Sequence, residues 1–154
     1  MTLVIRDATP ADRDIIADYN SRLSEETDDG PLDSTLIVPG VTALLADRAK
    51  GRYWLAEENG QIVGQIGITY EWSDWRNGML WWVQSVYVHA DHRRKGVFSA
   101  LFRHVESLAE EDSEVVGLRL YVERDNARAQ ATYTDLGLSM TGFQVMQSLF
   151  RDKS

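Results

Sequence analysis

The chain has 154 residues, of which 44% are hydrophobic and 26% charged, which is typical of one globular domain and not of a disordered segment. Its net charge of −8 disfavours nucleic-acid binding, and the absence of cysteine excludes disulfides and thiolate chemistry. No apolar run approaches the roughly 20 residues that span a bilayer, and residues 1–20 do not resemble a signal peptide. We therefore expect a cytoplasmic protein that binds neither nucleic acid nor membranes.

The N-terminal part of the chain predicts a short strand and two helices. Leu3–Arg6 has the character of a strand, and Thr9 is suited to cap a helix that has Pro10 at its first position. The acidic stretch Ser24–Ser34 predicts a loop or a frayed helix end, and a second helix is expected over Val41–Lys50. The apolar residues at helical spacing in the first helix are Ile15, Ile16, Tyr19 and Leu23.

Three strands are expected next. Arg52–Glu57 and Ile62–Trp72 flank Asn59-Gly60, a strong signal for a β-hairpin. After the polar turn Ser73–Gly78, the segment Met79–His89 is apolar on both faces, which is typical of a strand in the middle of a sheet. Residues 62–89 are therefore predicted to form the centre of the sheet.

The C-terminal part predicts alternating helices and strands. A loop at Ala90–Lys95 leads into an amphipathic helix, and Val116–Val122 alternates as a strand. Asn126–Asp135 predicts a short helix that Gly137 ends, and the apolar segment Phe143–Phe150 predicts a last strand. The order of elements predicts one α/β domain over residues 1–154. The amphipathic helix carries its apolar stripe at Val97, Leu101, Val105 and Leu108.

The loop before the amphipathic helix has the features of a phosphate site. Three cations, Arg93, Arg94 and Lys95, precede Gly96, and the N–H groups of the first helical turn have no intrahelical acceptor. Neither the P-loop pattern nor the dinucleotide-binding pattern of glycines is present. Taken alone, the loop is either a diphosphate site or a basic surface loop that caps a helix.

Two motifs resemble those of the GCN5-related N-acetyltransferase (GNAT) superfamily. The first, VYVHADHRRKGV at residues 86–97, is similar to its acyl-CoA signature, with Arg93 and Gly96 in register and Phe98 where a small residue is commonest. In the second, Asn126, Ala129, Tyr133 and Gly137 match a later family pattern. The resemblance implies a single-domain α/β GNAT-like fold, with a central, mixed, mostly antiparallel twisted sheet flanked by helices, and acetyl-CoA as co-substrate.

The resemblance also implies a role for each motif residue. The backbone of Val86–Val88 would hold pantetheine like an added strand, and the Val88 N–H would stabilise the oxyanion. Tyr133 would protonate the departing thiolate. The implied acyl-CoA-binding residues are Val86, Tyr87, Val88, Arg93, Arg94, Lys95, Gly96, Val97, Phe98, Ser99, Asn126 and Tyr133.

The general base and the acceptor site are less defined by the sequence. Relatives with a glutamate on the central strand would place it near Gln84, and an amide cannot accept a proton at neutral pH. Glu71 is the alternative candidate, although a solvated strand-end carboxylate or a water relay explains the pattern as well. Trp72, Trp75 and Gln84 are candidate substrate contacts, and core or dimer packing is an equal alternative for the two tryptophans.

Metal chemistry has no support in the sequence. His89 and His92 lie three residues apart without carboxylate or cysteine partners at ligand spacing, so no metal is expected. The predicted function is acetyl transfer from acetyl-CoA to the primary amine of a small molecule. A protein N-terminal or lysine acetyltransferase and a non-catalytic acyl-CoA sensor are the alternatives, and a homodimer is expected from the family and the apolar last strand.

Overall fold

The computed structural model describes residues 2–27 and 29–151. The chain divides into two compact units, residues 1–120 and residues 121–154, and each is described by itself. The expectation of one domain over residues 1–154 stays a prediction.

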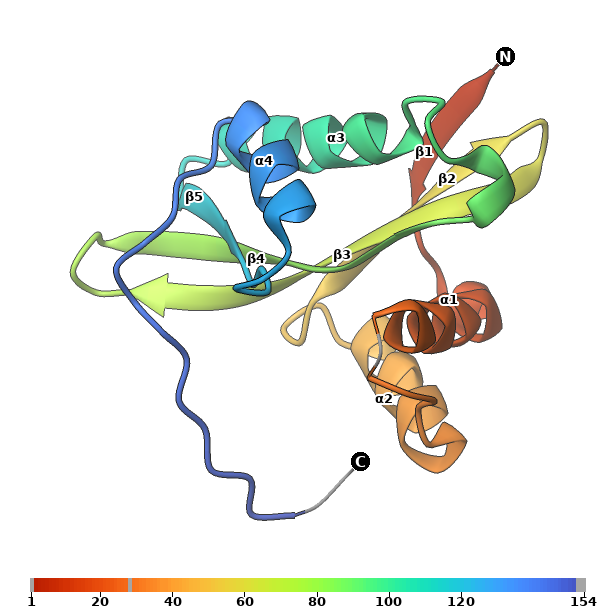
Figure 1. The fold of residues 1–154 in the computed structure, drawn as a ribbon, viewed down its shortest axis with the longest axis horizontal. Helices are drawn as coiled ribbons and strands as arrows, with labels where there is room; N and C mark the ends of the chain where they lie inside the picture. The colour runs from red at the N-terminus through yellow and green to blue at the C-terminus, as the bar shows by residue number, and fades with distance from the viewer. Residues whose placement is uncertain (1, 28, 152–154) are drawn as a thin grey trace. The chain divides into compact units, whose positions relative to one another are not determined.

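The first unit is built on a five-stranded sheet with the strand order β1-β2-β3-β4-β5 (Figure 1). Neighbouring strands are antiparallel except β4 and β5, which are parallel. This confirms the predicted mixed, mostly antiparallel sheet. The strand that follows the Asn59-Gly60 turn, Gln61–Ser73, lies at its centre. The strands are β1 (Leu3–Asp7), β2 (Arg52–Glu58), β3 (Gln61–Ser73), β4 (Gly78–Val88) and β5 (Val115–Leu120).

Helices cover both faces of this sheet. The helices α1 (Arg13–Glu26) and α2 (Ser34–Ala46) lie on one side, and α3 (Val97–Glu111) lies on the other (Figure 1). The side chains of β3 show the division, because neighbouring residues of a strand point to opposite faces. A Cβ on Gly64 would meet Leu101 of α3 at 3.1 Å, whereas the next residue, Gln65, bonds to Asn20 of α1.

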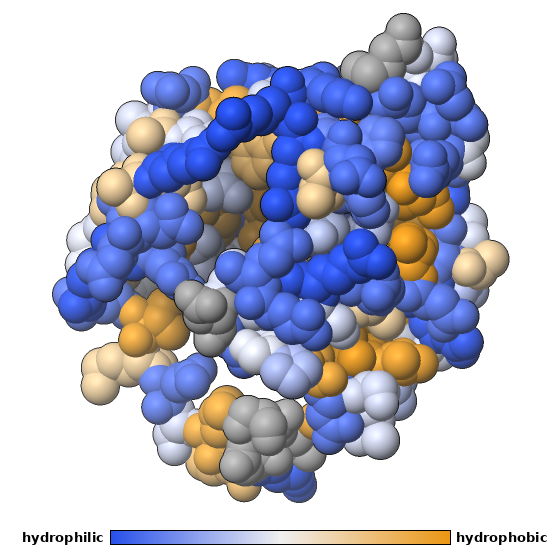
Figure 2. Space-filling view, turned by 45° about the vertical axis from the view of Figure 1, so that its right-hand side comes forward, coloured by the Kyte–Doolittle hydropathy of each residue, from blue (hydrophilic) through white to orange (hydrophobic). Residues whose placement is uncertain are grey.

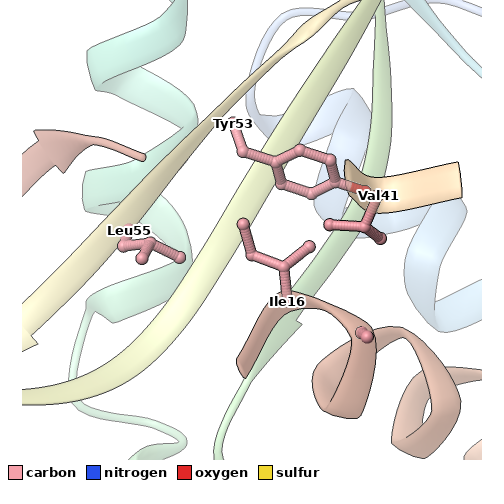
Figure 3. Packing of buried hydrophobic residues seen from close by; sticks show 5 residues of the cluster. Ile16, Val41, Tyr53 and Leu55 are labelled. Carbon is pink, nitrogen blue, oxygen red and sulfur yellow. The ribbon is translucent and has the colours of Figure 1, made fainter. Parts of the chain in front are cut away.

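The core on the α1 and α2 side centres on Tyr53. Its ring lies against Ile16 of α1 and Val41 of α2, with Leu55 of the same strand nearby (Figure 3). The ring also covers Gly67 on β3, where an added Cβ would come within 2.8 Å of it. A glycine is therefore required at position 67 because the aromatic ring occupies the space of a side chain. On the other face, the fully buried residues include Trp54, Leu101, Phe102 and Val105.

Hydrophilic residues cover most of the face in Figure 2, with hydrophobic residues in smaller patches between them. This distribution agrees with a net charge of −8 and a charged fraction of 26%. Among the helices of residues 2–27 and 29–151, none has the length and apolar character needed to cross a bilayer.

Two glycine signals in the sequence are confirmed. Asn59 and Gly60 have φ angles of 53° and 79°, as a type I′ hairpin turn requires. In the second unit, α4 (Ala127–Asp135) is followed by Gly137 in the C′ position, with a left-handed φ of 103°. Leu138 N donates to Tyr133 O at 3.0 Å, which closes a Schellman motif.

The predicted bounds of the second helix are wrong, and the first helix ends within the stretch for which a loop and a frayed helix end were both expected. α1 continues to Glu26, into the stretch expected to be a loop or a frayed end, and α2 covers Ser34–Ala46 instead of Val41–Lys50. The earlier start has a local cause, because the Asp33 carboxylate accepts a hydrogen bond from Thr35 N at 2.9 Å and caps the helix. Pro39 lies inside α2, where it removes one N–H donor without ending the helix.

The predicted last strand is also wrong. The segment 139–151 lies wholly within the described residues and contains no strand. Its apolar side chains are exposed, with Phe143 at 79% and Met146 at 95%. An alternating pattern favours a strand only where a neighbouring strand can pair with its backbone, and the pattern cannot supply that neighbour.

A partly buried ion pair between Arg6 and Asp12, before the start of α1, makes a first testable prediction. Asp12 is 8% exposed and accepts hydrogen bonds from both terminal nitrogens of Arg6 at 2.9 Å and from Thr9 N at 2.7 Å. The Arg6 guanidinium holds the pKa of Asp12 below its usual 3.8. We expect Asp12→Asn to lower the free energy of unfolding by about 2–3 kcal/mol at neutral pH, since it weakens charge-assisted bonds to a buried group.

The pH dependence of that loss has a defined sign. Because the pKa of Asp12 is lower in the folded state, its contribution is complete above the unfolded-state pKa and disappears as the pH falls through the folded-state pKa. Urea unfolding at a series of pH values should therefore show wild type and Asp12→Asn converging in acid. Asp14→Asn is the matched control, because Asp14 pairs with Arg13 while 81% exposed, and its loss should stay below about 1 kcal/mol. An equal loss in both variants would contradict the prediction.

Candidate active site

The last part of β4 leaves the regular ladder at a β-bulge. Gln65 pairs with Tyr87 and Gly67 pairs with Gln84, so Ile66 faces two residues of β4, Ser85 and Val86. Ser85 has a left-handed φ of 51°. That conformation costs a residue other than glycine about 1–2 kcal/mol, so the surrounding structure must hold it in place.

Beyond the bulge, the backbone of β4 has a free edge within the first unit. His89 N donates to Val63 O at 2.8 Å, which makes Val63 and His89 a hydrogen-bonded pair. The adjacent antiparallel pair, Gly64 and Val88, is then a non-hydrogen-bonded one, so the Val88 N–H and C=O point away from β3. On that side β5 pairs with β4 only over Met79–Val83 among the described residues of this unit. The Val88 N–H is therefore directed to the edge where pantetheine binding was predicted.

The loop after β4 exposes a run of backbone N–H groups. After a short 3-10 turn at Ala90–His92, Arg94 and Gly96 both have left-handed φ angles, 63° and 85°. α3 then begins at Val97, and the N–H groups of its first turn have no intrahelical acceptor. A Cβ on Gly96 would find no atom within 4 Å, so the space beside it is open. Backbone N–H groups in such a left-handed turn at a helix N-terminus fit a diphosphate.

Arg93 does not act as an isolated surface cation. Its Nε donates to Val88 O at 2.9 Å, and its Nη2 donates to Glu26 Oε1 at 2.7 Å. The Tyr87 hydroxyl donates to the other oxygen of Glu26 at 2.7 Å, and Arg93 lies 5.3 Å from the Tyr87 ring. The hydrogen bond from Tyr87, with that from Arg93, lowers the pKa of Glu26 below 4.5. Arg93 therefore connects the loop before α3 to the end of β4 and to α1.

Sequence reasoning missed the role of Glu26, which lies in the acidic stretch expected to be a loop or a frayed helix end. Its partners Tyr87 and Arg93 lie 61 and 67 residues away along the chain. No local pattern indicates which carboxylate of that run reaches the sheet. The acidic character of Ser24–Ser34 is the signal that was available.

The different positions of Arg93 and Arg94 lead to a second prediction. Arg93→Ala should weaken binding of acetyl-CoA by about 1–2 kcal/mol and also destabilise the free protein, because it removes the bonds to Val88 O and Glu26. Arg94→Ala should weaken acetyl-CoA by a similar amount and leave the stability of the free protein within about 0.5 kcal/mol of wild type. Calorimetric titration and urea unfolding measure the two effects. A fully stable Arg93→Ala protein would contradict the inferred connection.

The predicted acceptor residues are not brought together with Val88. Glu71 pairs with Leu80 and Trp72 with Met79, eight and nine residues before Val88 on β4. At about 3.3 Å per residue this places them roughly 25 Å from Val88 along the strand, and Trp75, which is 91% exposed, lies in the turn beyond them. Direct proton transfer needs hydrogen-bond reach, so the position of Glu71 argues against its predicted role as base at Val88.

The contacts of Glu71 and Gln84 also indicate that Glu71 is the weaker candidate for a site near Val88. Glu71 Oε1 accepts hydrogen bonds from Trp82 Nε1 at 2.8 Å and from Arg119 Nη1 at 2.9 Å. The bond from Trp82, with that from Arg119, holds the pKa of Glu71 below 4.5 and makes it a weak proton acceptor. Gln84 lies next to the bulge, where its Nε2 donates to Thr69 Oγ1 at 3.1 Å. Of the candidate acceptor residues, Gln84 is the one closest to Val88 along β4.

Asn126 and Tyr133 belong to the second unit. Asn126 caps α4, because its Oδ1 accepts a hydrogen bond from Ala129 N at 2.9 Å. Tyr133 lies seven residues further, on the same face of the helix. Burial raises the pKa of Tyr133 above 10, so its phenol carries its proton at neutral pH.

The described residues offer no group of three or more histidine or acidic side chains that could hold a metal ion.

Comparisons with known proteins agree with this geometry. The family model described as "Acetyltransferase (GNAT) family" matches residues 14–138. A possible acetyltransferase from Clostridium difficile 630 is 41% identical, with a TM-score of 0.92, and the match covers 99% of this chain and 100% of that one. A comparison with curated proteins finds no match.

Two more distant solved structures share the fold. A predicted acetyltransferase with acetyl-CoA from Clostridium acetobutylicum is 18% identical, with a TM-score of 0.81 and 96% of each chain covered. The ribosomal-protein-alanine N-acetyltransferase from Brucella melitensis biovar Abortus 2308 is 21% identical, with a TM-score of 0.75, covering 97% of this chain and 100% of that one. With its mixed five-stranded sheet and a family match over most of its length, the chain belongs to the GNAT family and is an acetyl-CoA-dependent N-acetyltransferase.

Proposed function

We propose that the enzyme transfers the acetyl group of acetyl-CoA directly to the primary amine of a small molecule. The observation that carries the proposal is the continuity of the free β4 edge at Val88 with the left-handed turn at Arg94 and Gly96. An extended pantetheine arm could pair with the first while the diphosphate binds the second. This arrangement would hold the thioester at the end of β4.

In the proposed reaction, the N–H groups from Gly96 to Ser99 bind the diphosphate, and Arg94 and Lys95 add positive charge. The edge of Val86–Val88 orients the pantetheine amides. As the amine attacks the thioester carbon, the Val88 N–H donates to the oxygen that becomes negative. The carbon–sulfur bond then breaks, and the Tyr133 hydroxyl gives its proton to the thiolate. Acetylated amine and CoA are the products.

The amine must lose a proton before or during its attack. We propose that this proton leaves through water and backbone carbonyls near the bulge, because the nearby carboxylate of Glu26 has a lowered pKa and is engaged by Tyr87 and Arg93. The rate should then rise with pH as more of the acceptor amine becomes neutral.

The proposed acceptor lies beside the C-terminal end of α1, because Glu26 contacts Tyr87 and Arg93 near the end of β4. An aminoglycoside acetyltransferase from a soil metagenomic sample shares the fold at 17% identity and a TM-score of 0.76, which is consistent with a small amine as acceptor. A peptide N-terminus or a lysine is the alternative, since the Brucella protein of the same fold is a ribosomal-protein-alanine N-acetyltransferase.

A thiol-release assay with acetyl-CoA and a panel of acceptors tests the proposal. The panel contains polyamines, amino sugars, aminoglycosides, amino-acid derivatives, a peptide with a free N-terminus and a lysine peptide. We expect release with at least one small amine and a slower reaction with both peptides. Release with the peptides alone would favour the protein acetyltransferase. A rise in Tm with acetyl-CoA but no release from any acceptor would favour the non-catalytic sensor.

Two further expectations remain part of the proposal. One is a cytoplasmic location. The other is a homodimer, supported by the exposed apolar side chains of residues 140–150, which sedimentation at micromolar concentration would distinguish from a 17.5 kDa monomer.

A further inference from the structure

A buried polar side chain contacts the bulge of β4. Gln65 on β3 is 0% exposed, and its Nε2 donates to Ser85 O at 3.0 Å and to Asn20 Oδ1 at 3.2 Å. Asn20, which is 7% exposed on α1, donates through Nδ2 to the Tyr53 hydroxyl at 3.3 Å. Tyr53 is the ring at the centre of the core in Figure 3. The chain of contacts thus runs from the core through α1 and β3 to the backbone of β4.

The hydrogen bond from Gln65 to Ser85 O supports a strained part of the backbone. Ser85 is the first of the two bulge residues and has a left-handed φ of 51°, a position that glycine commonly occupies in such bulges. A serine stays there only if the surroundings hold it. The Gln65 amide holds Ser85 by donating a hydrogen bond to its carbonyl oxygen. Ser85 itself lies outside the regular pairing of β3 with β4, at the bulge.

The orientation of Val88 depends on this bulge. Val88 follows Ser85 by three residues, and the extra residue shifts the alternation of N–H directions along β4. Without the extra residue of the bulge, each peptide group after Ser85 would point to the opposite edge of β4. The direction of the Val88 N–H is therefore set at Ser85.

We propose that Gln65 is a positioning residue that holds Ser85 in the bulge and so directs the Val88 N–H towards the thioester oxygen. The catalytic part of this inference rests on the proposed function, whereas the structural part does not. The hydrogen bonds of the Gln65 amide go to Asn20 and to Ser85 O, so its effect reaches the reaction through the backbone of β4.

Gln65→Met tests the inference, because methionine has a similar length and no donor. The matched control is Ile68→Val, a 1% exposed residue of the same strand that pairs with Val83, ahead of the bulge. For each variant we would measure Tm, the amide shifts and hydrogen exchange of residues 85–88 in the free protein, and kcat and KM for acetyl-CoA.

We expect Gln65→Met to shift the amide signals of Ser85 and Val88 and to speed their exchange. Its kcat should fall about 10- to 100-fold, which approaches the loss of an oxyanion donor, while KM for acetyl-CoA stays within about twofold. Ile68→Val should lower Tm and change neither the amides nor kcat by more than about twofold. Amide signals or kcat values that are the same in Gln65→Met as in Ile68→Val would overturn the inference.

Repeating the substitution in a Ser85→Gly protein separates the effect of Gln65 on the bulge from its effect on the stability of the fold. Ser85→Gly should reduce the effect of Gln65→Met on kcat, because glycine adopts the left-handed conformation without support. An undiminished effect in that background would also overturn the inference. The amide measurements need no turnover, so a wild-type protein that releases no thiol would refute the proposed function while the amides still decide the role of Gln65 in the bulge.

Discussion

Gly96→Glu is expected to abolish the rise in Tm that acetyl-CoA gives the wild-type enzyme. The space beside Gly96 is open, with no atom within 4 Å of an added Cβ, so a glutamate would occupy the position that we assign to the diphosphate. Its carboxylate would also repel the phosphates. At a ligand concentration of 100 Kd the wild type should gain about 2.7 kcal/mol, and the variant should gain almost nothing.

The free protein should still fold with this substitution. A side chain at φ 85° costs about 1–2 kcal/mol, so a modest fall in Tm without ligand is expected. Gly60→Glu is the matched control, because Gly60 has a φ of 79°, also has no atom within 4 Å of an added Cβ, and lies in the β2–β3 turn. It should lose similar stability and keep the full response to acetyl-CoA. A full response in Gly96→Glu would place the diphosphate elsewhere.

Tyr133→Phe is expected to lower kcat by about 10²–10⁴, the usual value of a positioned general acid. The variant loses one oxygen and little volume, so the fold and the affinity for acetyl-CoA should be retained. KM for the acyl donor should change little, because the lost interaction forms mainly in the transition state. Since the pKa of Tyr133 is raised by burial, its ionisation should not reduce the wild-type rate below about pH 10.

Steady-state kinetics with two acyl donors check this role. The loss should shrink with a donor whose thiol is more acidic, since that thiolate needs less help to leave. Tyr121→Phe, which changes a 60% exposed tyrosine of the same unit, should keep the wild-type kcat. If Tyr133→Phe turns over at the wild-type rate while chemistry is rate-limiting, Tyr133 is a packing residue.

The sequence by itself determined the features that depend on neighbouring residues. Asn59-Gly60 and Gly137 were correctly identified as turn and helix-end positions, because each needs a left-handed φ that glycine or asparagine adopts at low cost. Gly96 was singled out by the three cations before it and by the family motif, and the structure adds its left-handed φ of 85°. The middle of the sheet was predictable because a strand that is apolar on both faces must be covered on both.

The tertiary structure alone decided which distant groups meet. The contacts of Glu26 with Arg93 and of Gln65 with Ser85 span 67 and 20 residues, and no local pattern selects one carboxylate or amide over its neighbours. The apolar alternation of Phe143–Phe150 predicted a strand that did not form, since a strand also needs a partner for its backbone. Local propensity acts over a few residues, whereas bulges, partners and buried polar contacts are fixed by chain segments that come together only on folding.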